Sequence, residues 1–426
     1  MFKKILSIIS VPFFCICLSA CSFAGFNPLD KWKSDKINSL SEEQTEESTG
    51  NTKDDSVGPV YRVSKEIWND GSIIEYTYNQ DGTLRHSSEI QNEEYSDGVF
   101  ENLYDYYDNG CLKTIIFDYY GDSITSYSPN HLEIHCDKTG AFESIESSVD
   151  RELYMEKGVD IPVYEIEVTG EREFSIQGHI ERDVNDTFYN KRKYNATVTF
   201  VIELELEHNG QLVRRTKRIM NERGLFEKSF IWDEDSNTET NYIYINDING
   251  NPRLCVGKYD DSFDLQFILF YTDITGKVVS SESTLDESNA KEFVEGYFNA
   301  VCSGDSQKAW DFVYRPLREY FSITQEQNKV VSFCDEGLLP EDEGVDYGFK
   351  ILQCQKVKDI PLSELKDSVD DYFNNEFSYS KALNEMNGLR VTVDIFSTED
   401  ESVHETCNVY LVSDDAGEAG VFLITD

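Results

Sequence analysis

The sequence predicts a mainly β region, built as an antiparallel hairpin meander, followed by a separate α+β domain. Turn signals such as Asp108-Asn109-Gly110 recur along residues 59–285, and Asn-Gly favours tight hairpin turns. The stretches between these turns alternate apolar and acidic side chains, which is the pattern of a strand with one solvated face. After residue 286 the apolar spacing becomes that of an amphipathic helix, so we expect a second domain there.

The charge balance excludes one class of partner. The 426 residues contain 38 Lys and Arg against 81 Asp and Glu, for a net charge of −43. A surface this acidic repels phosphate backbones, so we expect no nucleic-acid partner. It also repels anionic lipids, so residence at a membrane requires an anchor.

The N-terminus carries the strongest functional signal. A basic start at Lys3-Lys4 precedes the mostly apolar run Ile5–Leu18, which is too short to span a bilayer comfortably. The tetrapeptide Leu18-Ser19-Ala20-Cys21 that follows resembles the lipobox of bacterial lipoproteins. The resemblance implies that residues 1–20 are a lipoprotein signal peptide and that Cys21 is lipidated, which would anchor the protein to the membrane. The alternatives are an uncleaved anchor and ordinary signal cleavage near Ala24.

Residues 21–58 are predicted to be an acidic flexible tether. Within them, Ser41–Ser56 contains no apolar residue and so cannot contribute to a packed core. The other seven cysteines, from Cys111 to Cys407, are scattered singly without a Cys-x-x-Cys pair. We interpret them mostly as small buried apolar residues rather than a disulfide framework.

Residues 59–285 are predicted to form a Tyr-rich β-hairpin repeat domain. The glycines of one series of turn signals recur at a nearly constant interval: Gly82, Gly110 and Gly140 are 28 and 30 residues apart. Gly224 follows Gly140 by 84 residues, which is three such intervals, and Gly250 follows Gly224 by 26. A fixed period in this range indicates repeated supersecondary units. Further turn signals end at glycines 71, 98, 210 and 276.

The pattern Tyr-x-Tyr-Asp/Asn-x-x-Gly-x-Leu resembles the YD repeats of RHS-type bacterial surface proteins. The matching positions are Tyr76, Tyr78, Asn79, Gly82 and Leu84, then Tyr104, Tyr106, Gly110 and Leu112, and more loosely Tyr242, Tyr244, Gly250 and Leu254. The resemblance implies a series of hairpins at the cell surface. Tyrosines at period two, such as Tyr76 and Tyr78, suit glycan or protein surfaces and equally suit sheet packing.

Residues 286–426 are predicted to form the α+β domain. Apolar residues from Ala290 to Val301 fall at helical spacing, and strands are expected at Tyr347–Val357, Leu389–Ser397, Val403–Val412 and Val421–Thr425. The segments Tyr297-Phe298-x-Ala300 and Gly304-Asp305, leading into Trp310, resemble the NTF2-like (cystatin-like) domains of Gram-positive lipoproteins. That resemblance implies a fold and no particular activity.

Two segments contain residues of metal-binding types at short, regular intervals. His131, Glu133 and His135 would share one face of a strand. No further protein ligand is evident near the two histidines, so an ordinary polar sheet face is preferred. The segment 233–239 spaces oxygen ligands like a calcium loop, but Thr238 stands where such loops need glycine. The sequence therefore predicts no metal site and no cofactor.

No catalytic residue is predicted. The sequence contains no Gly-x-Ser-x-Gly and no P-loop motif. In the C-terminal region the acid–base candidates are Asp311, Asp335, Asp394, His404 and Glu405, and no pattern selects one of them over a solvated surface role.

The sequence therefore predicts a lipid-anchored extracytoplasmic protein, non-enzymatic, that binds a ligand, glycan or protein partner at the cell surface. One alternative is an enzyme in the C-terminal domain acting on a small apolar substrate. The other is an immunity or envelope-maintenance component of a surface complex.

Overall fold

The computed structural model describes residues 61–425, apart from 92–97, 121–128, 159, 196–199, 222–223, 234–235, 261, 274–284, 325–346, 371–378 and 400–403. The predicted signal peptide, the tether and Cys21 lie outside the described residues. Among the helices that the described ranges contain, none is both long and apolar enough to cross a lipid bilayer.

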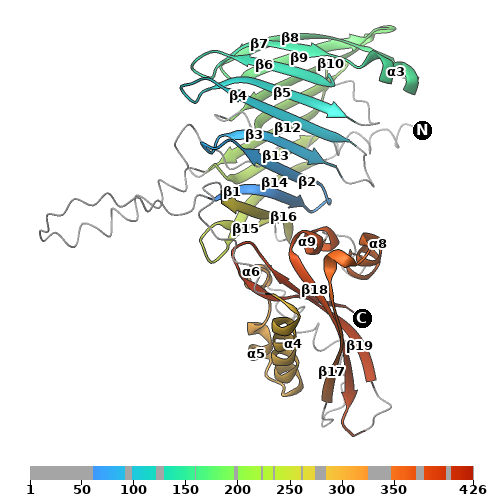
Figure 1. The fold of residues 1–426 in the computed structure, drawn as a ribbon. Coiled ribbons are helices and arrows are strands. Elements are labelled where there is room, and N and C mark those ends of the chain that lie inside the picture. The colour runs from blue at the N-terminus through green and yellow to red at the C-terminus, as the bar shows by residue number, and fades with distance from the viewer. Residues whose placement is uncertain are drawn as a thin grey trace, which may run out of the picture. The chain divides into compact units, whose positions relative to one another are not determined.

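Sixteen strands form one antiparallel sheet in the order β7-β6-β5-β4-β3-β2-β1-β16-β15-β14-β13-β12-β11-β10-β9-β8 (Figure 1). The first seven are β1 Tyr61–Trp68, β2 Ile73–Tyr78, β3 Leu84–Ile90, β4 Val99–Tyr106, β5 Leu112–Tyr120, β6 His131–Cys136 and β7 Phe142–Ser148. The others are β8 Pro162–Gly170, β9 Glu173–Ile180, β10 Asp183–Tyr194, β11 Val201–His208, β12 Gln211–Met220, β13 Phe226–Asp233, β14 Asn237–Asn246, β15 Pro252–Tyr259 and β16 Ser262–Asp273.

The chain divides into two compact units. Of the described residues, the first unit comprises 61–66, 72–242 and 272–273, and the second comprises 67–71, 243–271 and 285–425. The domain boundary that we expected between residues 285 and 286 stays a prediction. The second unit nevertheless includes β15 and most of β16, which precede that boundary.

The expected fold class is wrong. The chain is mainly β, with a sixteen-stranded antiparallel sheet and a small C-terminal four-stranded sheet with a few helices, rather than a hairpin repeat domain and a separate NTF2-like domain. Local patterns indicate which neighbouring strands form hairpins. They do not indicate that β16 hydrogen-bonds beside β1, a pairing between segments about 200 residues apart in the sequence.

Seven of the predicted turn glycines are confirmed, whereas Gly98 does not have the positive φ angle of the others. Positive φ angles occur at Gly71, Gly82, Gly110, Gly140, Gly210, Gly224 and Gly250, whereas Gly276 lies outside the described residues. In the β4–β5 turn, Gly110 N donates to Tyr107 O at 2.8 Å and Tyr107 N donates to Cys111 O at 2.9 Å. The same pair of bonds closes the turns at 79–83, 137–141, 221–225, 247–251 and 414–418.

The interval of about 28 residues therefore corresponds to one strand pair between turns at the same end of the sheet. The gap between Gly140 and Gly224 contains the β8–β9 and β10–β11 connections at 171–172 and 195–200, whose residues lack the Asp/Asn-x-Gly signal.

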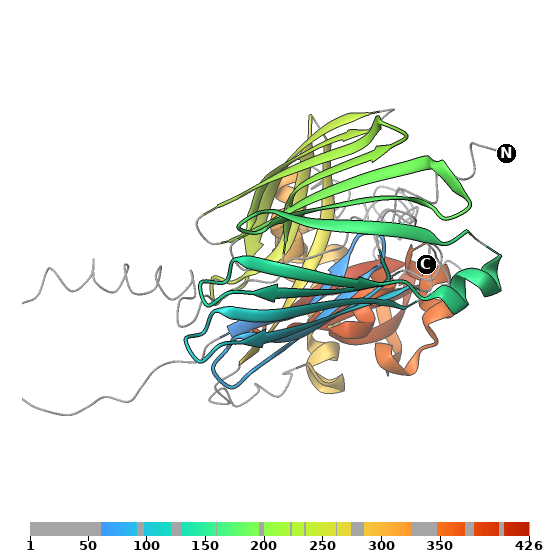
Figure 2. The same ribbon diagram turned by 90° about the horizontal axis from the view of Figure 1, so that it is seen from above.

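The two end strands of the sheet, β7 and β8, meet within the first unit. Phe142 N on β7 donates to Glu171 O at 2.7 Å, at the end of β8. The Phe142 ring packs near the rings of Phe174 on β9 and Tyr194 on β10, with centroids 6.3 and 5.9 Å away. The helix α3 (Arg151–Lys157) connects β7 to β8, and Figure 2 shows it at the ends of these two strands.

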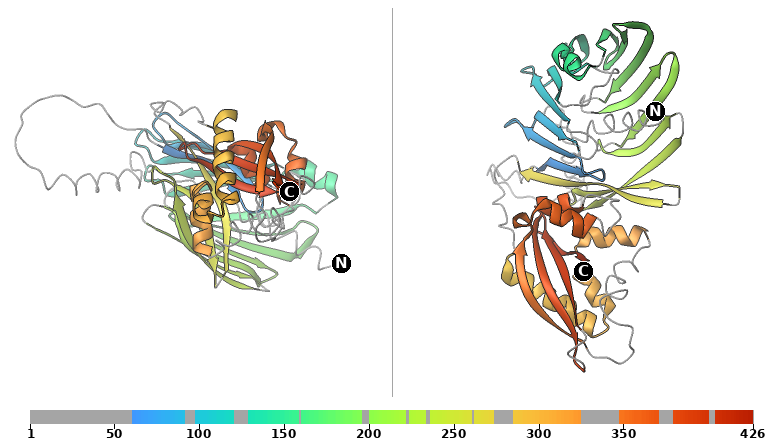
Figure 3. Two further views of the ribbon diagram at one scale, coloured as in Figure 1. Left: turned by 90° about the horizontal axis from the view of Figure 1, so that it is seen from below. Right: turned by 90° about the vertical axis from the view of Figure 1, so that its right-hand side faces the viewer.

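The C-terminal sheet has the order β17-β18-β19-β20 (Figure 3). Its strands are β17 Tyr347–Lys356, β18 Asn387–Ser397, β19 His404–Ser413 and β20 Ala419–Thr425. Before β17 come α4 Glu287–Cys302, α5 Ser306–Asp311 and α6 Arg315–Thr324; between β17 and β18 lie the 3₁₀ turn Val357–Asp359, α8 Leu362–Leu365, the π-helical turn Lys366–Asp370 and α9 Tyr379–Glu385.

The predicted helix at residues 290–301 is confirmed as α4. The Asp286 carboxylate caps it by accepting from Ser288 N and Asn289 N. Its apolar face packs on the alternate residues of β18 and β19 that point inward, including Val391, Val393 and Val409.

A buried ion network joins three segments of the second unit. Arg253 on β15 is fully buried and donates to Asp247 at 3.2 Å, to Leu269 O at 2.7 Å and to Asp415 in the β19–β20 turn. The neighbouring Asp414 accepts from the Tyr314 hydroxyl at 2.6 Å. Burial alone would disfavour the guanidinium charge, but the surrounding carboxylates outweigh it and raise the pKa of Arg253.

Candidate functional site

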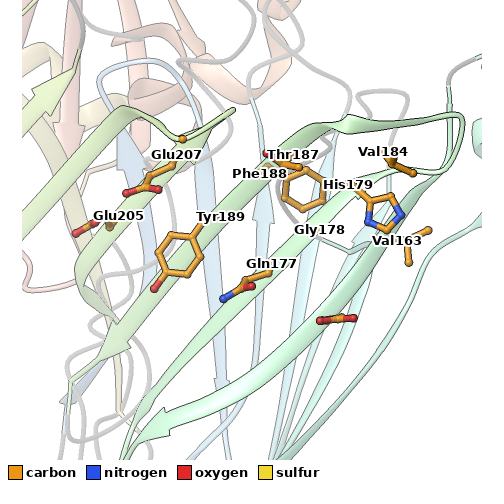
Figure 4. A pocket seen from close by; sticks show the side chains of 12 residues that line it. Val163, Gln177, Gly178, His179, Val184, Thr187, Phe188, Tyr189, Glu205 and Glu207 are labelled. Carbon is orange, nitrogen blue, oxygen red and sulfur yellow. The ribbon is translucent and has the colours of Figure 1, made fainter.

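A cavity of about 700 Å³ lies in the first unit, over β8, β9, β10 and β11 (Figure 4). Outward-facing side chains of these four strands form most of its lining, and turn residues complete the rim. The lining residues are Val163, Glu165, Gln177, Gly178, His179, Val184, Thr187, Phe188, Tyr189, Glu205, Glu207 and Gly210.

Strand register brings the polar side chains of the cavity into rows. Glu165 pairs with Gln177, Gln177 pairs with Tyr189, and Tyr189 pairs with Glu207. One row therefore crosses four strands and presents a carboxylate, an amide, a phenol and a second carboxylate. Because residues that pair across antiparallel strands lie about 5 Å apart, the row is about 15 Å long, and a small ligand can contact two or three neighbouring side chains of it at once.

A second row gives the cavity a less polar end. Val163 pairs with His179, and His179 pairs with Thr187. The Val163 side chain remains partly exposed there. A ligand in the cavity would therefore contact acidic groups and the Tyr189 ring near its centre and an aliphatic side chain near one end.

The cavity is electrostatically negative. Glu205 has a counter-charge, since Arg215 Nη2 lies 3.0 Å from it, and the nearby Lys191 is 2.9 Å from Glu173. Within the described part of the chain, Glu165 and Glu207 have no ion-pair partner. Burial raises the pKa of the Tyr189 hydroxyl, and the neighbouring glutamates raise it further against the opposing effect of Lys191.

Backbone and side-chain bonds fix one rim of the cavity. Asn209, in the β11–β12 turn with φ of 52°, donates its backbone N–H to Thr187 O and accepts from Thr187 N through its side-chain oxygen, both at 2.8 Å. His208 Nε2 is hydrogen-bonded to Asp186 Oδ1. These contacts hold the start of β10 against the β11–β12 turn.

Gly178 makes room for an aromatic ring behind the cavity. A Cβ atom at this position would lie 2.2 Å from the Phe188 ring, which is too close for any side chain. The Phe188 ring also makes an edge contact with Tyr164, with centroids 5.5 Å apart. The glycine therefore lets β9 and β10 pair closely while Phe188 stays buried.

The tyrosines singled out by the sequence pattern are buried in the sheet or hydrogen-bonded within it. Tyr76 is buried, and its hydroxyl donates to Glu66 at 3.1 Å. The Tyr78 hydroxyl donates to Val63 O at 2.6 Å, and Tyr104 is buried. The cavity tyrosine, Tyr189, lies outside every copy of the motif. The sequence of β10 carries no apolar–polar alternation that would single it out.

The histidine segment forms β6, and His131, Glu133 and His135 share its partly exposed face as predicted. His131 Nδ1 is 2.6 Å from Asp118 on β5, away from the other two. His135 instead lies between Glu133 and Glu146, and sequence analysis missed Glu146 because it is on the neighbouring strand β7.

Two acids of the calcium-like spacing at 233–239 have other partners. Asp233 accepts from the backbone and hydroxyl of Ser236 and closes the β13–β14 turn. Glu239 lies on β14 and pairs with Lys228 at 3.1 Å. Asp235 lies outside the described residues.

The C-terminal acid–base candidates are dispersed. His404 Nδ1 is 3.3 Å from Asp394 Oδ1, on the side of β18 opposite its buried valines, and His404 is exposed. Asp311 pairs with Arg318 at 3.2 Å, and Glu405 lies across from Ile395. Asp335 is outside the described residues.

Comparisons with known proteins give little guidance. No protein-family model and no curated protein matches the sequence. A porin-like protein from Bacteroides vulgatus aligns over 49% of this chain and 98% of its own, with 10% identity and a TM-score of 0.25. A porin-like protein from Bacteroides uniformis aligns over 50% and 95%, with 9% identity and a TM-score of 0.26. TM-scores this low carry no inference about function.

The two family resemblances drawn from the sequence are corrected. One continuous sixteen-stranded sheet replaces the expected series of YD hairpin units. A four-stranded meander with a few helices replaces the expected NTF2-like domain. Both errors have the same cause, since tyrosine-rich hairpins and a helix followed by a meander occur in many folds.

Proposed function

We propose that this protein binds a neutral or amine-bearing glycan in the cavity over β8–β11, and that a lipid on Cys21 holds it at an extracytoplasmic membrane surface. The observation that carries the binding proposal is the row Glu165, Gln177, Tyr189 and Glu207 across four paired strands.

The side chains of this row match the chemistry of a sugar. A pyranose ring has an apolar C–H face, which suits the broad apolar face of Tyr189, and vicinal hydroxyls, which suit carboxylate acceptors. Gln177 supplies both a donor and an acceptor beside the ring. A cavity of about 700 Å³ lies within the range of small-ligand sites and holds one or a few sugar units.

Charge selects the class of glycan. Glu165 and Glu207 lack ion-pair partners within the described ranges, and the whole chain carries a net charge of −43. An anionic ligand would therefore enter against the local and the overall field, whereas a neutral or amine-bearing sugar would not.

The proposed location rests on the N-terminal sequence. Leu18-Ser19-Ala20-Cys21 has the residue types of a lipobox, and the acidic segment 21–58 supplies a solvated spacer. Such a spacer would let the folded units stand away from the lipid headgroups and meet surface glycans.

The test is a glycan array followed by calorimetric titration of the best ligand with the full chain in detergent. We expect neutral or amino sugars among the ligands and no preference for anionic ones. Tyr189→Ala should weaken binding about five- to tenfold through loss of stacking area, because one aromatic contact contributes about 1–1.5 kcal/mol. Tyr120→Ala removes an exposed tyrosine from β5 and should leave affinity unchanged. Preference for anionic ligands, or equal binding by the Tyr189→Ala protein, would contradict the proposal.

A further inference from the structure

Three side chains on β6 and β7 gather ligand atoms of the kinds that transition metals prefer. Glu133 and His135 are two residues apart on the same face of β6, and Glu146 faces them from β7. His135 Nε2 lies 3.5 Å from Glu133 Oε1 and 3.8 Å from Glu146 Oε1. One ligand atom from each residue lies within 4.8 Å of the other two.

The arrangement is unfavourable without a cation. Glu133 and Glu146 are direct cross-strand partners, and like charges in that position destabilise a sheet. Elsewhere in this unit, acids on β11 face basic residues directly across the strand pair, as Glu205 faces Arg215 and Glu203 faces Lys217. Here the group between the two carboxylates is an imidazole, and no lysine or arginine pairs with either of them within the described ranges.

We propose that Glu133, His135 and Glu146 bind one divalent transition-metal ion of the zinc class. Two carboxylate oxygens and one imidazole nitrogen form a three-ligand set, and tetrahedral bonds of about 2.0–2.2 Å would require the ligand atoms to converge by small side-chain rotations. The nitrogen ligand favours zinc-class ions over calcium and magnesium, which prefer oxygen ligands alone.

The surroundings leave a further coordination position open. The residues paired with His135 are Thr114 on β5 and Ser144 on β7, both with short side chains. All three ligand residues are at least partly exposed. A water molecule or a ligand group can therefore complete the metal's coordination from the solvent side.

The site is separate from the cavity over β8–β11, since it shares no residue with that cavity's lining. Its test is therefore independent of the proposed glycan function.

The experiment is calorimetric titration of the full chain, freed of metal with a chelator, with Zn²⁺, and in parallel with Co²⁺ followed by visible absorption. We expect one site per chain, with the absorption of four- or five-coordinate Co²⁺. His135→Ala and Glu146→Gln should each weaken Zn²⁺ binding at least tenfold. His131→Ala is the matched control, because His131 lies on the same strand face but pairs with Asp118, and it should bind as the unchanged chain does.

Circular dichroism of each variant checks that the sheet is intact, and the exposed position of Glu146 makes Glu146→Gln the safer of the two substitutions. The proposal is overturned if the unchanged chain binds no Zn²⁺, if His135→Ala and Glu146→Gln bind it undiminished, or if His131→Ala loses as much affinity as they do.

Discussion

At the scale of single residues, one buried arginine has a structural role. Arg253 lies among Asp247, Asp414 and Asp415, which come from the β14–β15 and β19–β20 turns. A buried charge is stable only when its partners are present, because removal of one member leaves the others desolvated and uncompensated. The network therefore holds two hairpin turns of the second unit against β15.

Arg253→Met is expected to lower the free energy of unfolding by about 3–5 kcal/mol, because buried carboxylates lose their counter-charge. The measurement is urea unfolding of the full chain. Arg151→Met is the control: its ion pair with Glu181 is exposed on both sides, so a change within about 1 kcal/mol is expected. Equal effects of the two substitutions would show that the buried network adds no stability.

The second prediction at this scale concerns Cys21. Cys21→Ala should abolish incorporation of labelled fatty acid and leave a precursor that retains residues 1–20, because the thiol that accepts the lipid is gone. Cys17→Ala, which changes a cysteine of the apolar run, should be lipidated normally. Lipidation of the Cys21→Ala protein would refute the anchor assignment.

At the scale of elements, the turns follow directly from the sequence. A type of turn whose glycine needs positive φ is specified by a few adjacent residues, so Gly110 and its counterparts could be placed without knowledge of the sheet. The helix α4 was equally predictable, because its apolar spacing and the Asp286 cap are local.

Gly110 offers a test of this turn chemistry. With φ of 81°, Gly110→Val should destabilise the chain by about 1–2 kcal/mol, because a β-branched side chain is strained in left-handed backbone. Gly110→Asn should cost less, since asparagine adopts that region more readily. Thermal unfolding of both variants gives the comparison, and an Asn variant as unstable as the Val variant would contradict the explanation.

The candidate sites were only partly predictable at this scale. Glu165, Gln177, Tyr189 and Glu207 become neighbours through the registers of three strand pairs, and β10 itself has a register shift between Asp183 and Thr187. A shift of one residue would send Tyr189 to the other face. Glu146 was missed for the same reason, because its proximity to His135 depends on the β6–β7 register.

At the scale of the whole molecule, sequence patterns could not give the topology. Pairing of β16 beside β1 and of β7 near β8 depends on contacts between distant segments, and no local signal encodes it. Net charge operates at this scale as well: a value of −43 disfavours anionic partners regardless of which strands pair. The strand topology places the cavity on a large sheet, and the net negative charge disfavours anionic ligands there.

Hydrogen–deuterium exchange of the full chain, with and without the best glycan from the array, tests the central claim most directly. A ligand in the cavity should slow amide exchange in β8–β11, above all around Gln177, Tyr189 and Glu207, because binding stabilises the strands that hold it. Exchange in β17–β20 should not change. Protection confined to the C-terminal sheet, or no protection at a saturating ligand concentration, would contradict the account.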